Sequence, residues 1–164
     1  MKIYLNAIIQ ANYVVIGRGA FMYALTAKAM RYMDEYTISK GIPSAVLMEN
    51  AAGGLVNEII FRFPDKDTEF LVVVGHGNNG ADGLCVARWL IHLGYVVNVY
   101  FVGERSKVSR AFTDQLRILT SMSKSFRMYG LGSRDDLKIL QQRYELIIDG
   151  IFGIGLNRRF GANF

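Results

Sequence analysis

The sequence predicts an α/β protein: a three-layer αβα, Rossmann-like domain with a doubly wound, mainly parallel sheet that follows two helices. Two amphipathic helix patterns come first, and short β-branched runs then alternate with further helix patterns. The run Phe70–Val74 is continuously apolar, as in a strand that is buried on both faces. A glycine-rich loop, Gly75–Gly80, joins this run directly to a helix pattern, which is the order found in nucleotide-binding folds.

The two leading helices are delimited by caps and turn residues. The first is expected to run from an N-cap at Thr26 to about Ser39 and to stop at Gly41. A turn follows and ends in a second N-cap at Ser44, and the next helix should end before Pro64. The buried face of this second helix is expected to carry Leu47, Ala51, Leu55 and Ile59.

Strands and helices alternate in the rest of the chain. The expected strands are Phe70–Val74, Tyr95–Val102, Ser125–Tyr129 and Glu145–Asp149. The helix after the first strand should bury Val86, Trp89, Leu90 and Leu93 and end at Gly94. The helix after the second strand should bury Phe112, Leu116 and Leu119, and the helix after the third strand is short and capped by Ser133. If the strand order is 3-2-1-4, the first and fourth strands are neighbours about 4.8 Å apart.

Composition limits the classes of function. A chain of 164 residues with 51% hydrophobic and 20% charged residues is expected to form one globular domain. The net charge of +5 comes from scattered Lys and Arg without interleaved aromatics, so we expect anionic ligands rather than nucleic acid. No run reaches the ~20 apolar residues of a membrane span, and no membrane partner is expected. The single cysteine, Cys85, suits a reducing compartment and a cytoplasmic location. Residues 1–21 are interpreted as an extension outside the fold, and residues 22–164 as the domain.

The loop after the first strand carries the first candidate site. Its pattern Gly75-x-Gly77-x-x-Gly80 matches the dinucleotide fingerprint, in which glycines permit close backbone approach and a helix N-terminus faces a phosphate. A merely tight turn is the alternative. Asn78 and Asn79 add two carboxamides, and Asp82 is either a ligand contact or a helix cap.

The loop after the fourth strand, Asp149–Arg159, carries the second. Asp149 ends a buried strand, where open α/β sheets bind ligands, although a turn-forming role remains open. Arg158 or Arg159 could meet a phosphate or could be plain surface charge. At the switch point of the sheet Asn79 and Asp149 should approach each other, and their oxygens suit a hard cation or a ribose hydroxyl.

Three other reactive side chains have simpler interpretations. Cys85 is expected to be a small buried hydrophobe, and His92 an exposed helix residue. His76 either touches the ligand or only shapes the loop.

Four stretches of the chain belong together as motifs: Gly41–Ser44, Leu47–Ala51, Gly77–Gly83 and Asp149–Leu156. In sequence and in order they resemble the NAD(P)H-hydrate epimerase family, also called the YjeF N-terminal domain. The resemblance implies an isomerase of nicotinamide nucleotide repair, which interconverts the R and S epimers of hydrated NADH and NADPH. It also implies a potassium ion and an NAD(P)H-hydrate dehydratase as functional partner. A homodimer is an open alternative for the assembly.

The resemblance also assigns site residues. Asn79 and Asp149 match two potassium ligands. Substrate contacts match Asn78, Asn79, Gly80, Ala81, Asp82, Gly153, Ile154, Gly155, Leu156, Asn157, Arg158 and Arg159. Ala81 and Ala52 stand where the family usually has glycine, and Ala81 should be tolerated if its φ is negative. The family's later Asp-x-Pro-Ser-Gly segment is missing, so we expect an incomplete C-terminus, impaired activity and a catalytic carboxylate beyond residue 164.

Two other functions compete with this interpretation. In an NAD-dependent oxidoreductase, Glu104 at the end of the second strand would bind a ribose. The Asn78–Asn79 pair has no ready role in such an enzyme. A non-enzymatic scaffold of the same fold is the other alternative.

Overall fold

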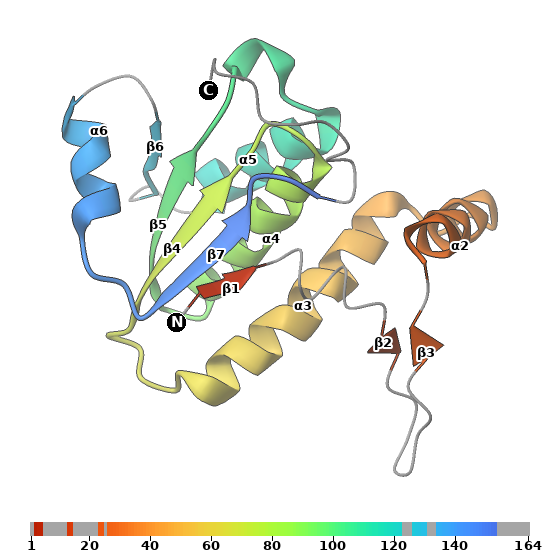
Figure 1. The fold of residues 1–164 in the computed structure, drawn as a ribbon, viewed down its shortest axis with the longest axis horizontal. Coiled ribbons are helices and arrows are strands. Elements are labelled where there is room, and N and C mark those ends of the chain that lie inside the picture. The colour runs from red at the N-terminus through yellow and green to blue at the C-terminus, as the bar shows by residue number, and fades with distance from the viewer. Residues whose placement is uncertain are drawn as a thin grey trace.

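A single sheet with a separate two-stranded ribbon forms the framework of the computed structural model, which describes residues 2–4, 13–14, 23–24, 26–122, 126–130 and 134–153. The strands are β1 (Lys2–Tyr4), β2 (Tyr13–Val14), β3 (Tyr23–Ala24), β4 (Glu69–Val74), β5 (Val96–Phe101), β6 (Met128–Gly130) and β7 (Leu146–Gly150). The helices are α2 (Ala27–Ser39), α3 (Ser44–Arg62), α4 (Asn78–His92), α5 (Arg110–Met122) and α6 (Arg134–Lys138), with short 3-10 turns η1 (Arg105–Lys107) and η2 (Ile139–Gln141). Figure 1 shows their arrangement.

The strand order confirms the expected topology. The sheet runs β1-β7-β4-β5-β6, and every neighbouring pair in it is parallel. In the predicted numbering this is 3-2-1-4, with β1 added beside β7. β4 is the central strand and is largely buried, as its uninterrupted apolar run predicts.

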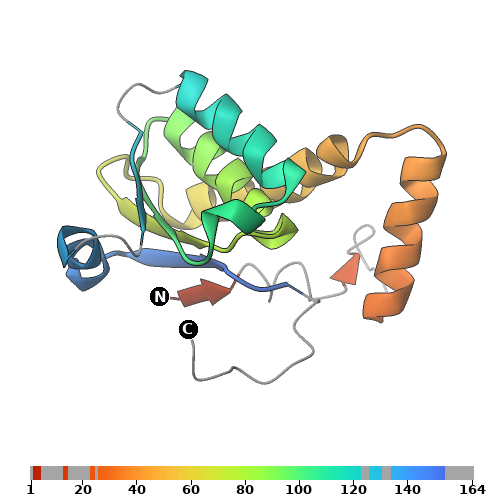
Figure 2. The same cartoon turned by 90° about the horizontal axis from the view of Figure 1, so that it is seen from above.

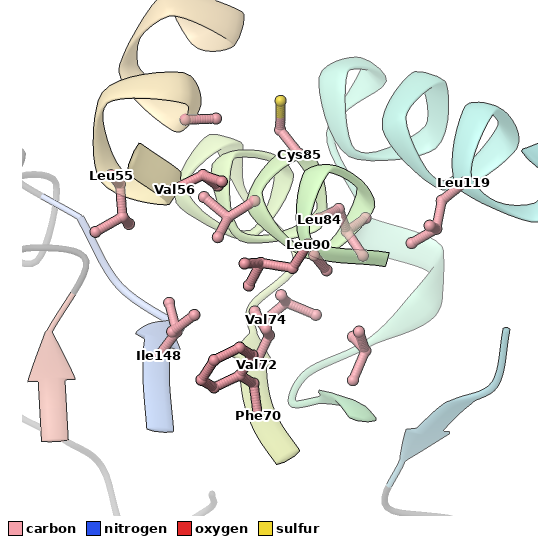
Figure 3. Packing of buried hydrophobic residues seen from close by; sticks show 14 of the residues in the cluster. Leu55, Val56, Phe70, Val72, Val74, Leu84, Cys85, Leu90, Leu119 and Ile148 are labelled. Carbon is pink, nitrogen blue, oxygen red and sulfur yellow. The ribbon is translucent and has the colours of Figure 1, made fainter. Parts of the chain in front are cut away.

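The layers of the predicted α/β fold are unequal in thickness. Helices α3, α4 and α5 lie against one face of the sheet (Figure 2). Their main core cluster is built around alternate residues of the strands, including Phe70, Val72 and Ile148 (Figure 3). The other face carries a small cluster that Leu71 and Tyr100 form with Ile139 of η2. The helix face of the sheet therefore supplies most of the hydrophobic stabilisation.

The caps and faces of the leading helices correct two predictions. Thr26 is the N-cap of α2, since its Oγ1 accepts a hydrogen bond from the Ala29 N–H at 3.2 Å. Ser44 is not a cap: the cap of α3 is Pro43, whose fixed φ suits a helix entry, and Ser44 is the first helical residue. Ala51 is exposed, and its neighbour Ala52 is buried instead. Leu55 and Ile59 are buried as predicted, whereas Leu47 is only half-buried.

Other expected elements shift by one to three residues. The strand expected at Ser125–Tyr129 is β6, and the last predicted strand is β7, which ends one residue later at Gly150. Ser133 lies outside the described residues. Buried Cys85 and exposed His92 both confirm their predicted environments.

The N-terminal segment contributes a short edge strand. Lys2–Tyr4 pair in parallel with β7, Tyr4 standing opposite Asp149. These three residues thus join the sheet, whereas residues 1–21 were interpreted as an extension outside the fold. The boundary at residue 22 stays a prediction, because most of that extension lies outside the described residues. No helix in the described part of the chain has both the length and the apolar character needed to cross a membrane.

Candidate functional site at the carboxyl edge of the sheet

The loops after β4 and β7 meet at the carboxyl edge of the sheet. The strands run side by side with Val73 opposite Asp149, and the Gly75 N–H donates to the Gly150 carbonyl at 3.1 Å. A Cβ on Gly75 would lie 2.2 Å from the Ile151 carbonyl oxygen. Only glycine at position 75 therefore lets the two loops lie this close.

The three glycines of the fingerprint have separate physical roles. A Cβ on Gly80 would lie 1.9 Å from the Gly75 carbonyl oxygen, so Gly80 permits the start of α4 to pack against the loop. Gly77 is the N-cap of α4 and has nothing within 4 Å of its Cβ position. Its backbone is open to a ligand at a helix N-terminus, where the first N–H groups have no helical acceptor. Fingerprint glycines at a pyrophosphate site divide their roles in this way.

Asn79 connects the two loops directly. Its Nδ2 donates to the Phe152 carbonyl at 3.1 Å, and its Oδ1 lies 3.5 Å from the position of a Cβ on Gly153. Asp149 lies in the same connection, where its Oδ1 accepts from the Ile151 N–H at 2.9 Å. Asn79 thus contacts the loop that follows Asp149, and the direct approach of the Asn79 and Asp149 side chains stays a prediction. Among the residues that the structure describes, no three His, Cys, Asp or Glu side chains gather as a metal site.

The remaining candidates of the first loop differ in exposure. Asn78 is exposed and can reach a ligand, whereas Ala81 is fully buried in the core. Every described non-glycine residue has a negative φ, so the alanine in place of the family's glycine fits the helix without strain. Ala81 therefore presents no side-chain surface to a ligand, and its N–H donates to the Gly77 carbonyl at 3.2 Å.

Asp82 is the most perturbed carboxyl of the site. Burial, and to a smaller extent the nearby carboxylate of Asp34 on α2, raises its pKa to about 7. The side chain is only partly exposed, so an anionic carboxylate there is weakly solvated. Asp82 lies just past the first turn of α4, near the open backbone of Gly77, and a carboxyl with this property there is a functional-site candidate on physical grounds.

His76 shapes the loop. Its carbonyl accepts a hydrogen bond from the Ser109 N–H at 2.8 Å, and its Nδ1 lies 2.9 Å from the position of a Cβ on Gly103. The loop after β4 is thereby packed against the connection from β5 to α5. Residues Ile154, Gly155, Leu156, Asn157, Arg158 and Arg159 lie outside the described residues.

A polar network behind the site was not predicted. Glu49 of α3 forms an ion pair with Arg88 of α4 and accepts from Trp89 Nε1 at 2.8 Å, while Arg88 Nε donates to Gln115 at 3.3 Å. Burial raises the pKa of the Glu49 carboxyl, but the hydrogen bonds from Trp89 and Arg88 outweigh it and lower the pKa. The network holds α3, α4 and α5 together. The available sequence signal for this network was Glu49, a charged residue on the apolar side of α3.

Cys85 lies beside this network and is unreactive. Burial, the larger cause, and the Glu49 carboxylate together raise the pKa of its thiol to about 12. A thiol of this kind is not a nucleophile at neutral pH.

Comparison with known proteins identifies the family. The family model described as "YjeF-related protein N-terminus" matches residues 44–164. The chain belongs to the YjeF N-terminal family. The matched residues include both loops of the site, and the resemblance stated from the sequence is confirmed.

Relatives of this YjeF N-terminal chain carry the name NAD(P)H-hydrate epimerase. A protein of Anaerococcus prevotii is 38% identical over 145 residues, which are 86% of this chain and 64% of the relative. A protein of Oenococcus oeni is 37% identical over 135 residues, 82% of this chain and 60% of the relative. The crystal structure of the yeast protein ynu0 superposes with a TM-score of 0.72 at 24% identity, over 85% of this chain and 60% of that one. This chain thus spans about 60–64% of the relatives' length.

Proposed function

We propose that this chain carries the nucleotide-binding part of an isomerase that interconverts the R and S epimers of hydrated NADH and NADPH. The relatives' names support the proposal, and they favour neither an oxidoreductase nor a scaffold. The observation that carries it is the contact of Asn79 with Phe152, which joins the glycine-rich loop to the loop after β7. One ligand can therefore contact both loops at the switch point of the sheet.

The two loops divide the work. The open backbone at Gly77 and the N-terminus of α4 suit the diphosphate. Asn78, Asn79 and Asp82, the backbone of Gly80 and Ala81, and Gly153–Arg159 are proposed as the substrate-binding residues. Epimerisation requires the ring hydroxyl to leave and to return on the opposite face, so a proton must be given and taken back at that oxygen.

A potassium ion fits the donors at the meeting point of the loops. Because the Asn79 amide nitrogen donates to Phe152, its Oδ1 is the atom left to bind a cation. Together with the Asp149 carboxylate it offers the oxygen ligands that a hard cation prefers. Such an ion would fix the two loops and supply positive charge beside an anionic nucleotide.

The setting of the reaction is part of the proposal. A dehydratase that removes the ring hydroxyl is the functional partner, and the cytoplasm, where nicotinamide nucleotides are used, is the location. The exposed apolar residues Tyr32, Met33 and Tyr36 of α2 support a homodimer.

The test is the ratio of the two epimers, followed by chromatography with and without potassium. Starting from a single epimer of hydrated NADH, we expect slow equilibration with potassium, in line with the impaired activity expected from the sequence, and a rate at least tenfold lower without it. Asn79→Ala and Asp149→Asn should remove the potassium dependence. The control Asn57→Ala changes an exposed asparagine of α3 and should behave as the unchanged chain. Binding of hydrated NADH without equilibration at any potassium concentration would refute the proposed reaction.

A further inference from the structure

The connection from β5 to α5 places a charged group beside the glycine-rich loop. β5 pairs with β4 on the side opposite β7, and the Val102 N–H donates to the Val74 carbonyl at 2.8 Å. Gly103 has φ +132°, a conformation that favours glycine. This turn sets residues 104–107 at the same edge of the sheet as the N-terminus of α4 (Figure 1).

Glu104 and Lys107 form an ion pair in this turn. The Glu104 Oε2 lies 2.6 Å from Lys107 Nζ, and its Oε1 accepts from the Ser106 hydroxyl at 2.6 Å. The Lys107 hydrogen bond, ahead of the one from Ser106, lowers the pKa of Glu104. Both charged side chains are about two-thirds exposed, at 60% and 66%, so a ligand can reach either one.

The position of this pair gives the nucleotide a direction. In parallel nucleotide-binding sheets, an acid at the end of the strand next to the glycine-rich strand binds the adenosine ribose. β5 is that strand here, and Glu104 follows its last residues. With the diphosphate at Gly77, the adenosine half extends toward β5 and the nicotinamide half toward Asp149 on β7.

We propose, on the basis of the proposed function, that Glu104 and Lys107 bind the adenosine ribose and determine whether the site accepts a free 2′-hydroxyl, a 2′-phosphate or both. Glu104 accepts hydrogen bonds from the free hydroxyls of the NADH form. Lys107 turns away from Glu104 and pairs with the 2′-phosphate of the NADPH form, and Ser106 offers a further donor to it. Lys107 neutralises Glu104 when the NADH form is bound and neutralises the 2′-phosphate when the NADPH form is bound, so the site accepts both nucleotides.

The charges predict opposite effects for the two residues. Lys107→Met removes the cation and leaves Glu104 as an uncompensated anion that repels a 2′-phosphate. Glu104→Gln removes that anion and weakens the acceptor for a free hydroxyl. A residue that only shaped the turn would change both nucleotides in the same direction.

The experiment measures the Kd of two probes by calorimetry: adenosine 5′-monophosphate and adenosine 2′,5′-bisphosphate. Lys107→Met should raise the Kd of the bisphosphate about tenfold and change the Kd of the monophosphate less than twofold. Glu104→Gln should raise the Kd of the monophosphate about threefold and leave the Kd of the bisphosphate unchanged or lower. The controls Arg62→Met and Glu58→Gln neutralise an exposed pair at the far end of α3 and should leave both Kd values unchanged.

Three results would overturn the assignment: shifts of both probes in one direction, an unchanged ratio of the two Kd values, or no binding of either probe to the unaltered chain. Epimer ratios are measured on the same samples. If the probes shift oppositely but no epimer equilibrates, the reaction is refuted and the ribose assignment stands. If epimers equilibrate while the probe ratio is fixed, the ribose assignment alone fails.

Discussion

Replacing Asp82 with asparagine should make the protein more stable at neutral and alkaline pH. The folded protein holds the pKa of this carboxyl at about 7, against an ordinary 3.8, so the native state binds its proton more tightly than the unfolded chain does. The contribution of Asp82 to stability is therefore complete below pH 3.8 and is lost as pH rises through 7. About three pKa units at 1.36 kcal/mol each give an upper value of about 4 kcal/mol for the cost of the anion.

Urea unfolding between pH 4 and pH 8.5 measures this cost. The free energy of unfolding of Asp82→Asn should exceed that of the unaltered chain by about 2–4 kcal/mol at pH 8.5. This difference should shrink to about 0.5 kcal/mol or less at pH 4. Asp34→Asn removes the smaller of the two causes and should give a smaller gain in the same pH range. The control Asp67→Asn removes an exposed carboxylate before β4 and should leave the pH profile unchanged.

A direct titration completes the test. The carboxyl carbon of Asp82, followed by NMR, should titrate with a midpoint near 7, and the midpoint should fall in Asp34→Asn. Parallel stability profiles of Asp82→Asn and the unaltered chain across this range would show that burial does not perturb Asp82, and the reasoning would be refuted.

Two further substitutions test the framework of the site. Gly80→Ala would place a methyl group 1.9 Å from a backbone oxygen and should cost about 3 kcal/mol or more in urea unfolding, while Gly77→Ala, with open space at its Cβ, should cost less than about 1 kcal/mol. Equal losses for the two would contradict this geometry. Glu49→Gln leaves the Arg88 side chain, 13% exposed, without its carboxylate and should cost about 2–3 kcal/mol. The exposed ion pair broken by Glu58→Gln should cost about 0.5 kcal/mol or less, and a similar loss in both variants would argue against the network.

The topology and the meeting of the two loops could be predicted because they depend on local signals. A buried β-branched run, a glycine-rich turn and a helix pattern define each strand-to-helix unit, and right-handed crossovers leave few strand orders. The strand order, the pairing of β4 with β7 and the burial of Cys85 followed from these signals.

Features set by contacts between helices could not be predicted in the same way. Periodicity assigned Ala51 to the buried face, but the packing of α4 on α3 selects Ala52. The pairing of Glu49 with Arg88 joins residues 39 apart, and nothing local to either residue specifies it. The raised pKa of Asp82 likewise depends on Asp34, which a separate helix supplies.

The carboxyl edge of the sheet gathers features that do not serve stability. Gly75 and Gly80 raise the entropy of the unfolded chain. At each of them, however, a backbone oxygen lies so close that any side chain would clash with it. Asp82 adds a poorly solvated carboxyl just past the first turn of α4. Local choices that oppose stability and converge at one place are expected where a site binds a ligand. An anionic nucleotide at the N-terminus of α4 explains the glycines, but it would repel an ionised Asp82. We therefore expect Asp82 to bind ligand in its protonated form, as a donor to the nucleotide, and nucleotide affinity to fall as pH rises through 7.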